Sequence, residues 1–188
     1  MANYIKTEIP DVVIVEPQIF EDERGYFFEP YNRREFEKNI GVVDFVQDGQ
    51  SKSTYGVLRG LHFQLNPYAA AKYVSVMKGK VLDVAVDIRK GSPTYGKYVA
   101  VEISDKNNLR VFVPRGFAHG FITLSDEAIF YYKYDNYYQP DSESGIRFDD
   151  PQLNIDWKVP KKDIIVSPKD AACKYLTETP NNFEYDAG

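Results

Sequence analysis

The sequence has only one cysteine with which to cross-link the chain, and it has no long apolar segment that could anchor it in a membrane. Cys173 is the single cysteine among 188 residues, so no intramolecular disulfide can form. No apolar run approaches the roughly 18 residues of a membrane helix. Lys6, Glu8 and Asp11 interrupt the segment where a signal peptide would be apolar. We therefore expect a cytoplasmic protein with no membrane partner.

Basic residues are also scarce, since 23 Lys and Arg stand against 28 Asp and Glu, and the formal charge is -5. A protein that binds nucleic acid non-specifically needs a basic surface to displace the counterions of the phosphates. We therefore expect no nucleic-acid partner, although one local basic pocket for a small anion fits this composition.

Aromatic residues, in contrast, are abundant, and the 15 Tyr and 12 Phe favour β-strands. The contents of 43% hydrophobic and 27% charged residues are typical of a globular chain. The length suits one domain with its own core, and no linker or repeat divides the sequence. We therefore treat residues 1–188 as a single domain.

Short strand-like runs alternate with turn signals at intervals of about 8–12 residues, which is typical of an all-β sandwich or barrel. Asn32, Glu35 and Gly41 predict a short helix over residues 33–39. Tight hairpins are expected at Gly79-Lys80 and at residues 105–108. From about residue 139 we expect a tail of loops and short helices packed on the barrel. The expected strands cover residues 11–17, 25–31, 44–51, 57–64, 72–77, 80–88, 97–104, 109–113, 118–124 and 128–134.

The two histidines can be weighed one by one. Taken alone, each would more often be a half-buried structural residue than a functional one. Their contexts, however, resemble the two motifs of the cupin jelly roll: Gly56 precedes His62 by six residues, and His119 ends the pattern Pro114-x-Gly116-x-x-His119.

Metal-binding cupins carry a second histidine and an acid in the first motif. Here Gln64 and Lys72 stand at those positions. A lysine in place of a carboxylate ligand would repel a divalent cation. The resemblance therefore implies a cupin-type jelly roll with no metal.

Further motifs narrow the resemblance to one family. Taken in order from about residue 12 to residue 170, they resemble the dTDP-4-dehydrorhamnose 3,5-epimerases. The matching segments are residues 22–27, 56–64 with Lys72, 84–89 running into 92–96, 114–121, Tyr132-Lys133 with Tyr138, and 149–151 with 155–157.

This resemblance implies the conversion of dTDP-4-dehydro-6-deoxy-glucose to dTDP-4-dehydro-rhamnose in dTDP-rhamnose biosynthesis, with no cofactor. The sequence has no phosphate-binding glycine loop and no dinucleotide fingerprint, which agrees with a reaction that needs no NAD. Epimerisation beside a ketone requires a base, an acid on the opposite side of the sugar ring and a group that stabilises the enolate oxygen.

The resemblance also assigns these roles to residues. His62 would be the base, because an imidazole titrates near neutral pH, and Asp170 would orient it. Tyr132 would be the acid, and Lys72 would stabilise the enolate. The resemblance also implies residues that bind the substrate. Arg24, Arg59 and His119 would contact the diphosphate, and the nucleobase and deoxyribose would be contacted by Phe27, Glu29, Gln47 and Tyr138.

In the family, the early strand that carries Phe27 and Glu29 crosses to the neighbouring subunit. The resemblance therefore implies a homodimer with strand exchange at its interface.

Strand geometry raises one conflict within this set. Arg59 and His62 are three residues apart, so a regular strand would point them to opposite faces. Both can line one pocket only if the strand is irregular, and Gly60 could host a bulge there. Asp83 lies on the polar face of its expected strand and could support Lys72 or His119.

Two departures from the family keep alternatives open. Gly49 stands where the family usually has Asn, and Ala69-Ala70-Ala71 replaces a stretch that usually contains Gln. The nearest alternative is a 3-epimerase, or a 3,5-epimerase of another nucleotide-linked 4-keto sugar. A 3,4-ketoisomerase on this fold and a catalytically silent sugar-nucleotide-binding cupin are less favoured. Gln64 and Lys72 argue against a metal-dependent cupin dioxygenase.

Overall fold

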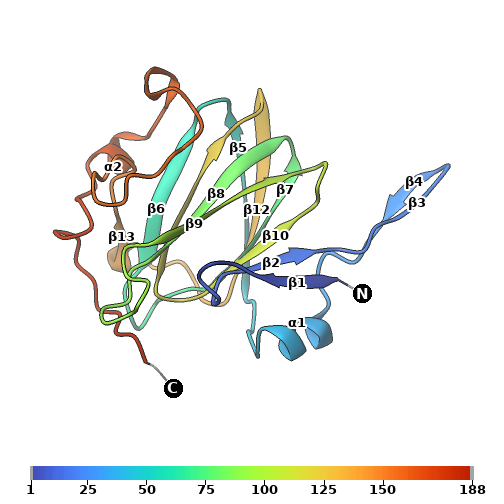
Figure 1. The fold of residues 1–188 in the computed structure, drawn as a ribbon, viewed down its shortest axis with the longest axis horizontal. Coiled ribbons are helices and arrows are strands. Elements are labelled where there is room, and N and C mark those ends of the chain that lie inside the picture. Colours follow the sequence, from blue (N-terminus) through green and yellow to red (C-terminus); the bar gives the residue numbers. More distant parts are fainter. Residues whose placement is uncertain (1, 187–188) are drawn as a thin grey trace.

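Two antiparallel β-sheets pack against each other in the computed structural model, which describes residues 2–186 (Figure 1). The six-stranded sheet has the order β1 (Asn3–Lys6), β2 (Val13–Glu16), β10 (Arg110–Val113), β7 (Lys72–Lys78), β12 (Glu127–Tyr134) and β5 (Gln47–Thr54). The five-stranded sheet has the order β13 (Glu143–Gly145), β6 (Leu58–Gln64), β11 (Phe117–Thr123), β8 (Lys80–Asp87) and β9 (Tyr98–Ser104).

The remaining elements are short. β3 (Phe20–Asp22) and β4 (Gly25–Phe27) form a two-stranded arm that projects away from the sheets (Figure 1). The helical segments are α1 (Arg33–Asn39), η1 (Pro140–Ser142), η2 (Lys161–Asp163) and α2 (Pro168–Ala171). None of the helices among residues 2–186 has the length and apolar character needed to cross a membrane.

This architecture confirms the all-β, cupin-type jelly roll that the sequence predicted. The helix at residues 33–39 is also confirmed, and the Asn32 side chain caps it by accepting from the Glu35 N–H at 3.3 Å. All ten expected strands have a counterpart in the structure. The sequence reading missed β1, β3 and β13, which are three or four residues long and show little alternation.

The two predicted hairpins are wrong. Gly79-Lys80 joins β7 to β8, and residues 105–108 join β9 to β10, but each of these turns leads from one sheet to the other. In a jelly roll the chain alternates between facing sheets, so strands that follow each other in sequence need not pair. A tight turn therefore marks a corner of the barrel here.

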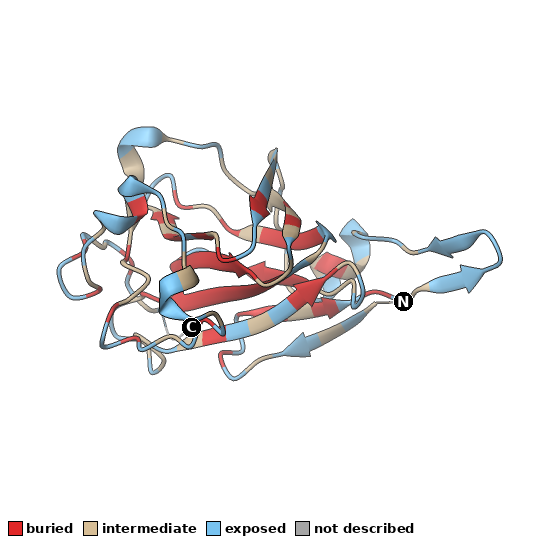
Figure 2. Ribbon diagram, turned by 90° about the horizontal axis from the view of Figure 1, so that it is seen from above, coloured by how far each residue is buried: buried red, intermediate tan, exposed pale blue. Residues whose placement is uncertain are grey.

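Buried side chains form layers on both faces of the five-stranded sheet. In Figure 2 the buried residues of the strands are red. On β8, Val81 and Ala85 face the six-stranded sheet, while Leu82, Val84 and Val86 pack outward. The outward layer is covered by the segment after residue 145, whose Ile146, Leu153, Trp157, Leu176 and Phe183 join the same cluster. Before this segment, β13 pairs with β6 and so adds a strand to the sheet.

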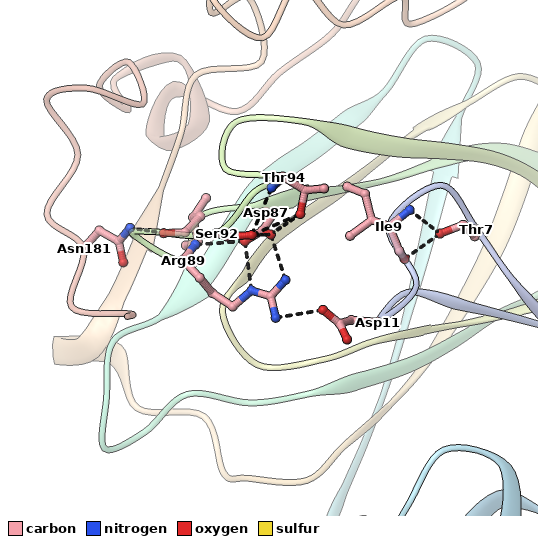
Figure 3. A network of polar contacts seen from close by, with 9 residues as sticks. Thr7, Ile9, Asp11, Asp87, Arg89, Ser92, Thr94 and Asn181 are labelled. Atoms are coloured by element: carbon pink, nitrogen blue, oxygen red, sulfur yellow. Dashed lines mark hydrogen bonds and ion pairs between the residues drawn. The ribbon is translucent and has the colours of Figure 1, made fainter. Parts of the chain in front are cut away.

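A polar cluster ties both ends of the chain to the end of β8 (Figure 3). The fully buried Asp87 carboxylate accepts from the Arg89 guanidinium at 2.7 Å and from the Ser92 and Thr94 hydroxyls. Arg89 also pairs with Asp11 at 2.9 Å, near the N-terminus. Asn181, near the C-terminus, donates to the Ile88 carbonyl. These contacts hold the segment around Asp11 and the segment around Asn181 against the end of β8.

Candidate active site

An irregularity in β6 decides which of its side chains share a cavity. His62 pairs with His119 of β11, and Arg59 pairs with Phe121, so β6 contains one more residue than β11 between these two pairs. Gly60 lies inside this bulge with φ of 120°. An added Cβ there would be 2.7 Å from the Gly120 Cα, so only glycine fits.

The bulge resolves the conflict between strand geometry and the proposed pocket. Because of the extra residue, Arg59 and His62 line the same cavity. The Arg59 guanidinium donates to the Ser53 hydroxyl at 3.0 Å and to the Lys52 carbonyl at 3.3 Å. The Arg59 side chain therefore lies between β5 and the cavity.

The turn before α2 brings a carboxylate to His62. Ile165 runs beside the start of β6 and accepts from the Leu58 N–H at 2.8 Å. The Ser167 side chain then caps α2 by accepting from the Asp170 N–H at 3.0 Å. As a result, Asp170 accepts from Nε2 of His62 at 2.7 Å and from the Gly60 N–H at 3.3 Å.

Access differs between the two partners of this pair. The Asp170 side chain is 5% exposed, whereas the His62 side chain is 30% exposed. Burial tends to raise the pKa of Asp170, but the hydrogen bonds from His62 and Gly60 hold it below its usual range. The carboxylate therefore stays ionised, and the Nδ1 side of the His62 ring is left for a substrate.

The six-stranded sheet supplies the opposite wall of the cavity. Lys72 of β7 and Tyr132 of β12 both line it, together with His62 and Asp170. Burial lowers the pKa of Lys72 to about 8, and it raises the pKa of Tyr132 to about 12. Near neutral pH this wall therefore presents an ammonium and a protonated phenol.

A second histidine–carboxylate pair lies behind the first. Nε2 of His119 is 2.8 Å from Oδ1 of Asp83, and both side chains are almost completely buried. Burial lowers the pKa of His119, with a further contribution from the charge of Lys72, so this imidazole is neutral near pH 7. Asp83 is therefore the partner of His119, one of the two roles considered for it from the sequence.

The predicted binding residues fall into three places. Arg59 and His119 line the cavity described above, whose volume is about 580 Å³. Gln47 and Tyr138 line an adjoining cavity, and the Gln47 side chain accepts from the Tyr138 N–H at 3.1 Å. Both cavities include His62, Lys72 and Tyr134, so they meet at these residues.

Arg24, Phe27 and Glu29 line neither cavity of their own chain. Arg24 lies in the turn of the arm and pairs with Asp22, and Phe27 is 66% exposed. Glu29 lies at the base of the arm. Their predicted role in binding therefore stays a prediction that depends on a second subunit.

Sequence reasoning missed several residues that line the site. Glu143 of β13 accepts from the Tyr138 hydroxyl and from the Lys169 ammonium. Burial tends to raise the pKa of Glu143, but these two donors hold it below its usual range. Ser51 contacts the Tyr132 hydroxyl at 3.4 Å. The alternation of β5 could have identified Ser51, but nothing near Glu143 in the sequence marks it.

The positions that would carry metal ligands in other cupins have different partners here. The Gln64 amide donates to the carbonyls of Tyr68 and Tyr137, and its oxygen accepts from the Gln139 N–H at 2.6 Å. Gln64 therefore holds loops together, while the Lys72 ammonium donates to the His62 carbonyl at 3.3 Å.

Comparison with known proteins places these features in a family. The family model for dTDP-4-dehydrorhamnose 3,5-epimerase matches residues 6–178. The chain is 55% identical over 169 residues to the dTDP-4-dehydrorhamnose 3,5-epimerase of Shigella flexneri, covering 89% of this chain and 92% of that protein.

Two solved structures show the same fold. The dTDP-4-dehydrorhamnose 3,5-epimerase of Elizabethkingia anophelis superposes with a TM-score of 0.91 at 50% identity, covering 94% of this chain and 97% of that one. The dTDP-6-deoxy-D-glucose-3,5-epimerase of Legionella pneumophila, solved in complex with dTDP-4-keto-L-rhamnose, has a TM-score of 0.93 at 46% identity and covers 100% of both chains. The chain therefore belongs to the dTDP-4-dehydrorhamnose 3,5-epimerase family.

Proposed function

We propose that this protein converts dTDP-4-dehydro-6-deoxy-glucose to dTDP-4-dehydro-rhamnose by inverting carbons 3 and 5, as a step of dTDP-rhamnose biosynthesis. The observation that carries the proposal is one cavity that contains the His62–Asp170 pair, Tyr132 and Lys72. Its volume of about 580 Å³ lies within the range of about 300–1,000 Å³ that is usual for small-molecule sites.

His62 is the base in this proposal. Because the Asp170 carboxylate accepts from Nε2, the ring proton stays on that nitrogen and Nδ1 carries the free lone pair. Nδ1 removes a proton from a carbon next to the 4-keto group. The imidazolium that forms is stabilised by the ionised Asp170 beside it.

Lys72 stabilises the product of that step. Removal of the proton moves negative charge onto the oxygen of the 4-keto group, and an enolate forms. An ammonium group in a partly buried site stabilises such a charge strongly, because little water is present to screen it. The pKa of about 8 keeps Lys72 mostly protonated near neutral pH.

Tyr132 completes the inversion. Its phenol is protonated at neutral pH, because its pKa is raised to about 12, and it lies on the sheet that faces His62. It donates a proton to the face of the enolate opposite the base. The two walls of the cavity thus supply the base and the acid that inversion requires.

The diphosphate and the thymine base of the substrate need further contacts. Arg59 offers a guanidinium fork, which suits phosphate oxygens, and Gln47 and Tyr138 line the adjoining cavity. The exposed arm supports a homodimer in which Arg24, Phe27 and Glu29 enter the partner's site. An arm that holds Tyr26 and Phe27 more than 60% exposed presents an apolar surface that suits a second subunit.

Proton NMR in deuterated water tests the reaction. The wild-type protein should introduce deuterium at carbons 3 and 5 of dTDP-4-keto-6-deoxy-glucose and produce the inverted sugar. Exchange at carbon 3 alone would instead support a 3-epimerase, and no exchange would support a silent sugar-nucleotide-binding cupin. Exhaustive chelation is a control, because a reaction driven by His62, Tyr132 and Lys72 should continue without a metal.

The Tyr132→Phe variant separates the acid from the base. It removes one hydroxyl and keeps the ring, so the fold should be little changed. Inversion should fall by roughly 10²–10⁴-fold, the usual contribution of one positioned acid or base, while His62 still exchanges protons on its own side. Equal losses of exchange and inversion would show that Tyr132 does not act as a separate acid.

A mixing experiment tests the role of the arm in trans. A His62→Ala chain has an intact arm, and an Arg24→Ala, Phe27→Ala chain has an intact cavity. If the arm completes the partner's site, mixed dimers of two inactive chains should regain activity. Activity that does not recover, although mixed dimers form, would contradict the shared site.

A further inference from the structure

Tyr132 is held in place by packing more than by hydrogen bonds. Among the described residues, its hydroxyl has one hydrogen-bond partner, Ser51 Oγ, at the long distance of 3.4 Å. Its ring lies between two others on the same face of β12. Phe130 packs against one side with centroids 4.7 Å apart, and Tyr134 stacks on the other side at 5.5 Å with an interplanar angle of 13°.

Tyr134 occupies a place that Gly49 leaves open. Gly49 of β5 is the direct cross-strand partner of Tyr132. A Cβ added to Gly49 would be 3.2 Å from Cε2 of Tyr134 and 3.7 Å from Cδ2 of Tyr132. The first of these distances is tighter than an ordinary van der Waals contact, and a side chain longer than alanine would need the space that the Tyr134 ring fills.

Backbone conformation gives no reason for a glycine at this position. Gly49 lies within a regular run of β5–β12 pairs from Gln47 to Thr54, and its φ is not in the positive region that favours glycine. Other residues could adopt this backbone. The missing side chain therefore serves to make room, and the room is taken by an aromatic ring.

Tyr134 also stands at the junction of the site. It lines both cavities, a property that it shares with His62 and Lys72. Its cross-strand partner on β7 is Lys72. Any movement of the Tyr134 ring would therefore change the packing around Tyr132 on one side and the shape of the substrate cavity on the other.

We propose that Tyr134, seated in the space left by Gly49, is a positioning residue that fixes the Tyr132 phenol for proton delivery to the enolate. This role rests on the proposed function, because it requires Tyr132 to be the acid. Without the Tyr134 ring, Tyr132 can tilt into the junction between the cavities. The base lies on the other sheet and its partner Asp170 lies in α2, so both keep their contacts.

The expected result is a change in how the enolate divides between inversion and return to the original configuration. A displaced acid slows proton delivery on the inverting face, while His62 continues to remove and return protons on its own side. The ratio of inversion to deuterium exchange should therefore fall. A misplacement of about 1 Å can cost roughly 10²-fold in rate, so a loss of 10–10²-fold in this ratio is expected for Tyr134→Ala.

Five variants, Tyr134→Ala among them, test the arrangement, and each is measured for both rates by proton NMR in deuterated water. Tyr134→Phe keeps the ring and should preserve the ratio. Gly49→Asn forces a side chain into the Tyr134 ring and should lower it. The double variant Gly49→Asn, Tyr134→Ala should lose no more than the worse of its two single variants, because both changes act through the same ring. Tyr131→Ala is the matched control, because its hydroxyl bonds Asp48 on the opposite face of β12.

The outcomes separate this role from the proposed function. Circular dichroism and thermal melting first establish that each variant is folded. A wild type that exchanges, together with a folded Tyr134→Ala variant of unchanged ratio, would overturn the positioning role alone. A double variant whose loss equals the product of the two single losses would also overturn it, because the two positions would then act independently. A wild type without any exchange would overturn the proposed function and this role with it.

Discussion

The protein contains two histidine–aspartate pairs of similar geometry in very different surroundings. His62–Asp170 and His119–Asp83 have separations of 2.7 and 2.8 Å, and the two histidines are direct partners across β6 and β11. The exposed fraction of the side chain is 30% for His62 and 2% for His119. We call His62–Asp170 the open pair, and we call His119–Asp83 the closed pair, because its side chains are almost completely buried although His119 borders the cavity.

The difference shows that access, more than chemistry, assigns the roles. Asp170 comes from a tail segment laid along the edge of β6, and it approaches its histidine from outside the barrel. Asp83 comes from a central strand and holds its histidine within the core between the sheets. A histidine that must accept a proton from a substrate needs the first arrangement, and one that must stay neutral and fixed suits the second.

The largest expected effect comes from removing the carboxylate of the open pair. Asp170→Asn leaves the size of the side chain unchanged but no longer stabilises the imidazolium. Deuterium exchange should therefore fall by roughly 10²–10⁴-fold. Asp83→Asn is the matched control, and its folded molecules should lose much less exchange activity. Equal losses in the two variants would mean that the closed pair also takes part in proton removal.

A smaller effect is expected on the pH dependence of the reaction, and it concerns the ammonium group of Lys72. Lys72 has a pKa of about 8 and should lose its proton, and with it the enolate stabilisation, as the pH rises. The rate kcat/KM should therefore fall above about pH 8, approaching tenfold per pH unit. Tyr132, whose pKa is about 12, stays protonated throughout this range.

Lys72→Arg provides the control for that assignment. A guanidinium remains charged to above about pH 12, so the alkaline decline near pH 8 should disappear even though the overall rate is reduced. The measurement is a pH profile of kcat/KM for both proteins between pH 6 and pH 10. A decline that persists unchanged in Lys72→Arg would assign it to another group.

The smallest effect is on stability and concerns the closed pair. Burial lowers the pKa of His119 below its ordinary value of 6.5, so the unfolded chain binds more protons than the folded one just below that pH. The free energy of unfolding should therefore decrease as the pH falls through 6.5 toward the folded-state pKa, by at most about 1.4 kcal/mol per pH unit.

Chemical denaturation at pH 7.5 and 5.5 measures this contribution, with His119→Gln as the comparison. The wild type should lose more stability between these pH values than the variant does, because the variant has no group to titrate at this position. Identical losses would show that His119 binds its proton equally well in both states.

Local structure was largely predictable from the sequence. The helix at residues 33–39 follows from its cap, and the ten expected strands follow from aromatic and β-branched runs between turns. Such signals depend on residues that are close together in the chain, so they can be recognised in the sequence. The pairing of strands depends on residues far apart in the chain, and the hairpin expected at Gly79-Lys80 proved to be a corner between two sheets.

The candidate site was predictable only in part. The motifs around His62 and His119, together with their resemblance to one family, identified the residues of the cavity walls. They did not identify Glu143, which reaches the site because β13 pairs with the end of β6. The possibility of a bulge at Gly60 could be stated, but its existence depends on the close approach of Gly120 on the neighbouring strand.

By itself, the sequence therefore determined the elements, the class of fold and the residue types of a proton-transfer site. Only the tertiary structure decided which histidine is open, which strand carries the bulge and which ring fills the space beside Gly49. These properties arise between residues far apart in the chain, such as His62 and Asp170, whose contact spans 108 positions. A contact of that kind depends on how whole sheets and the tail pack together, and no local pattern encodes it.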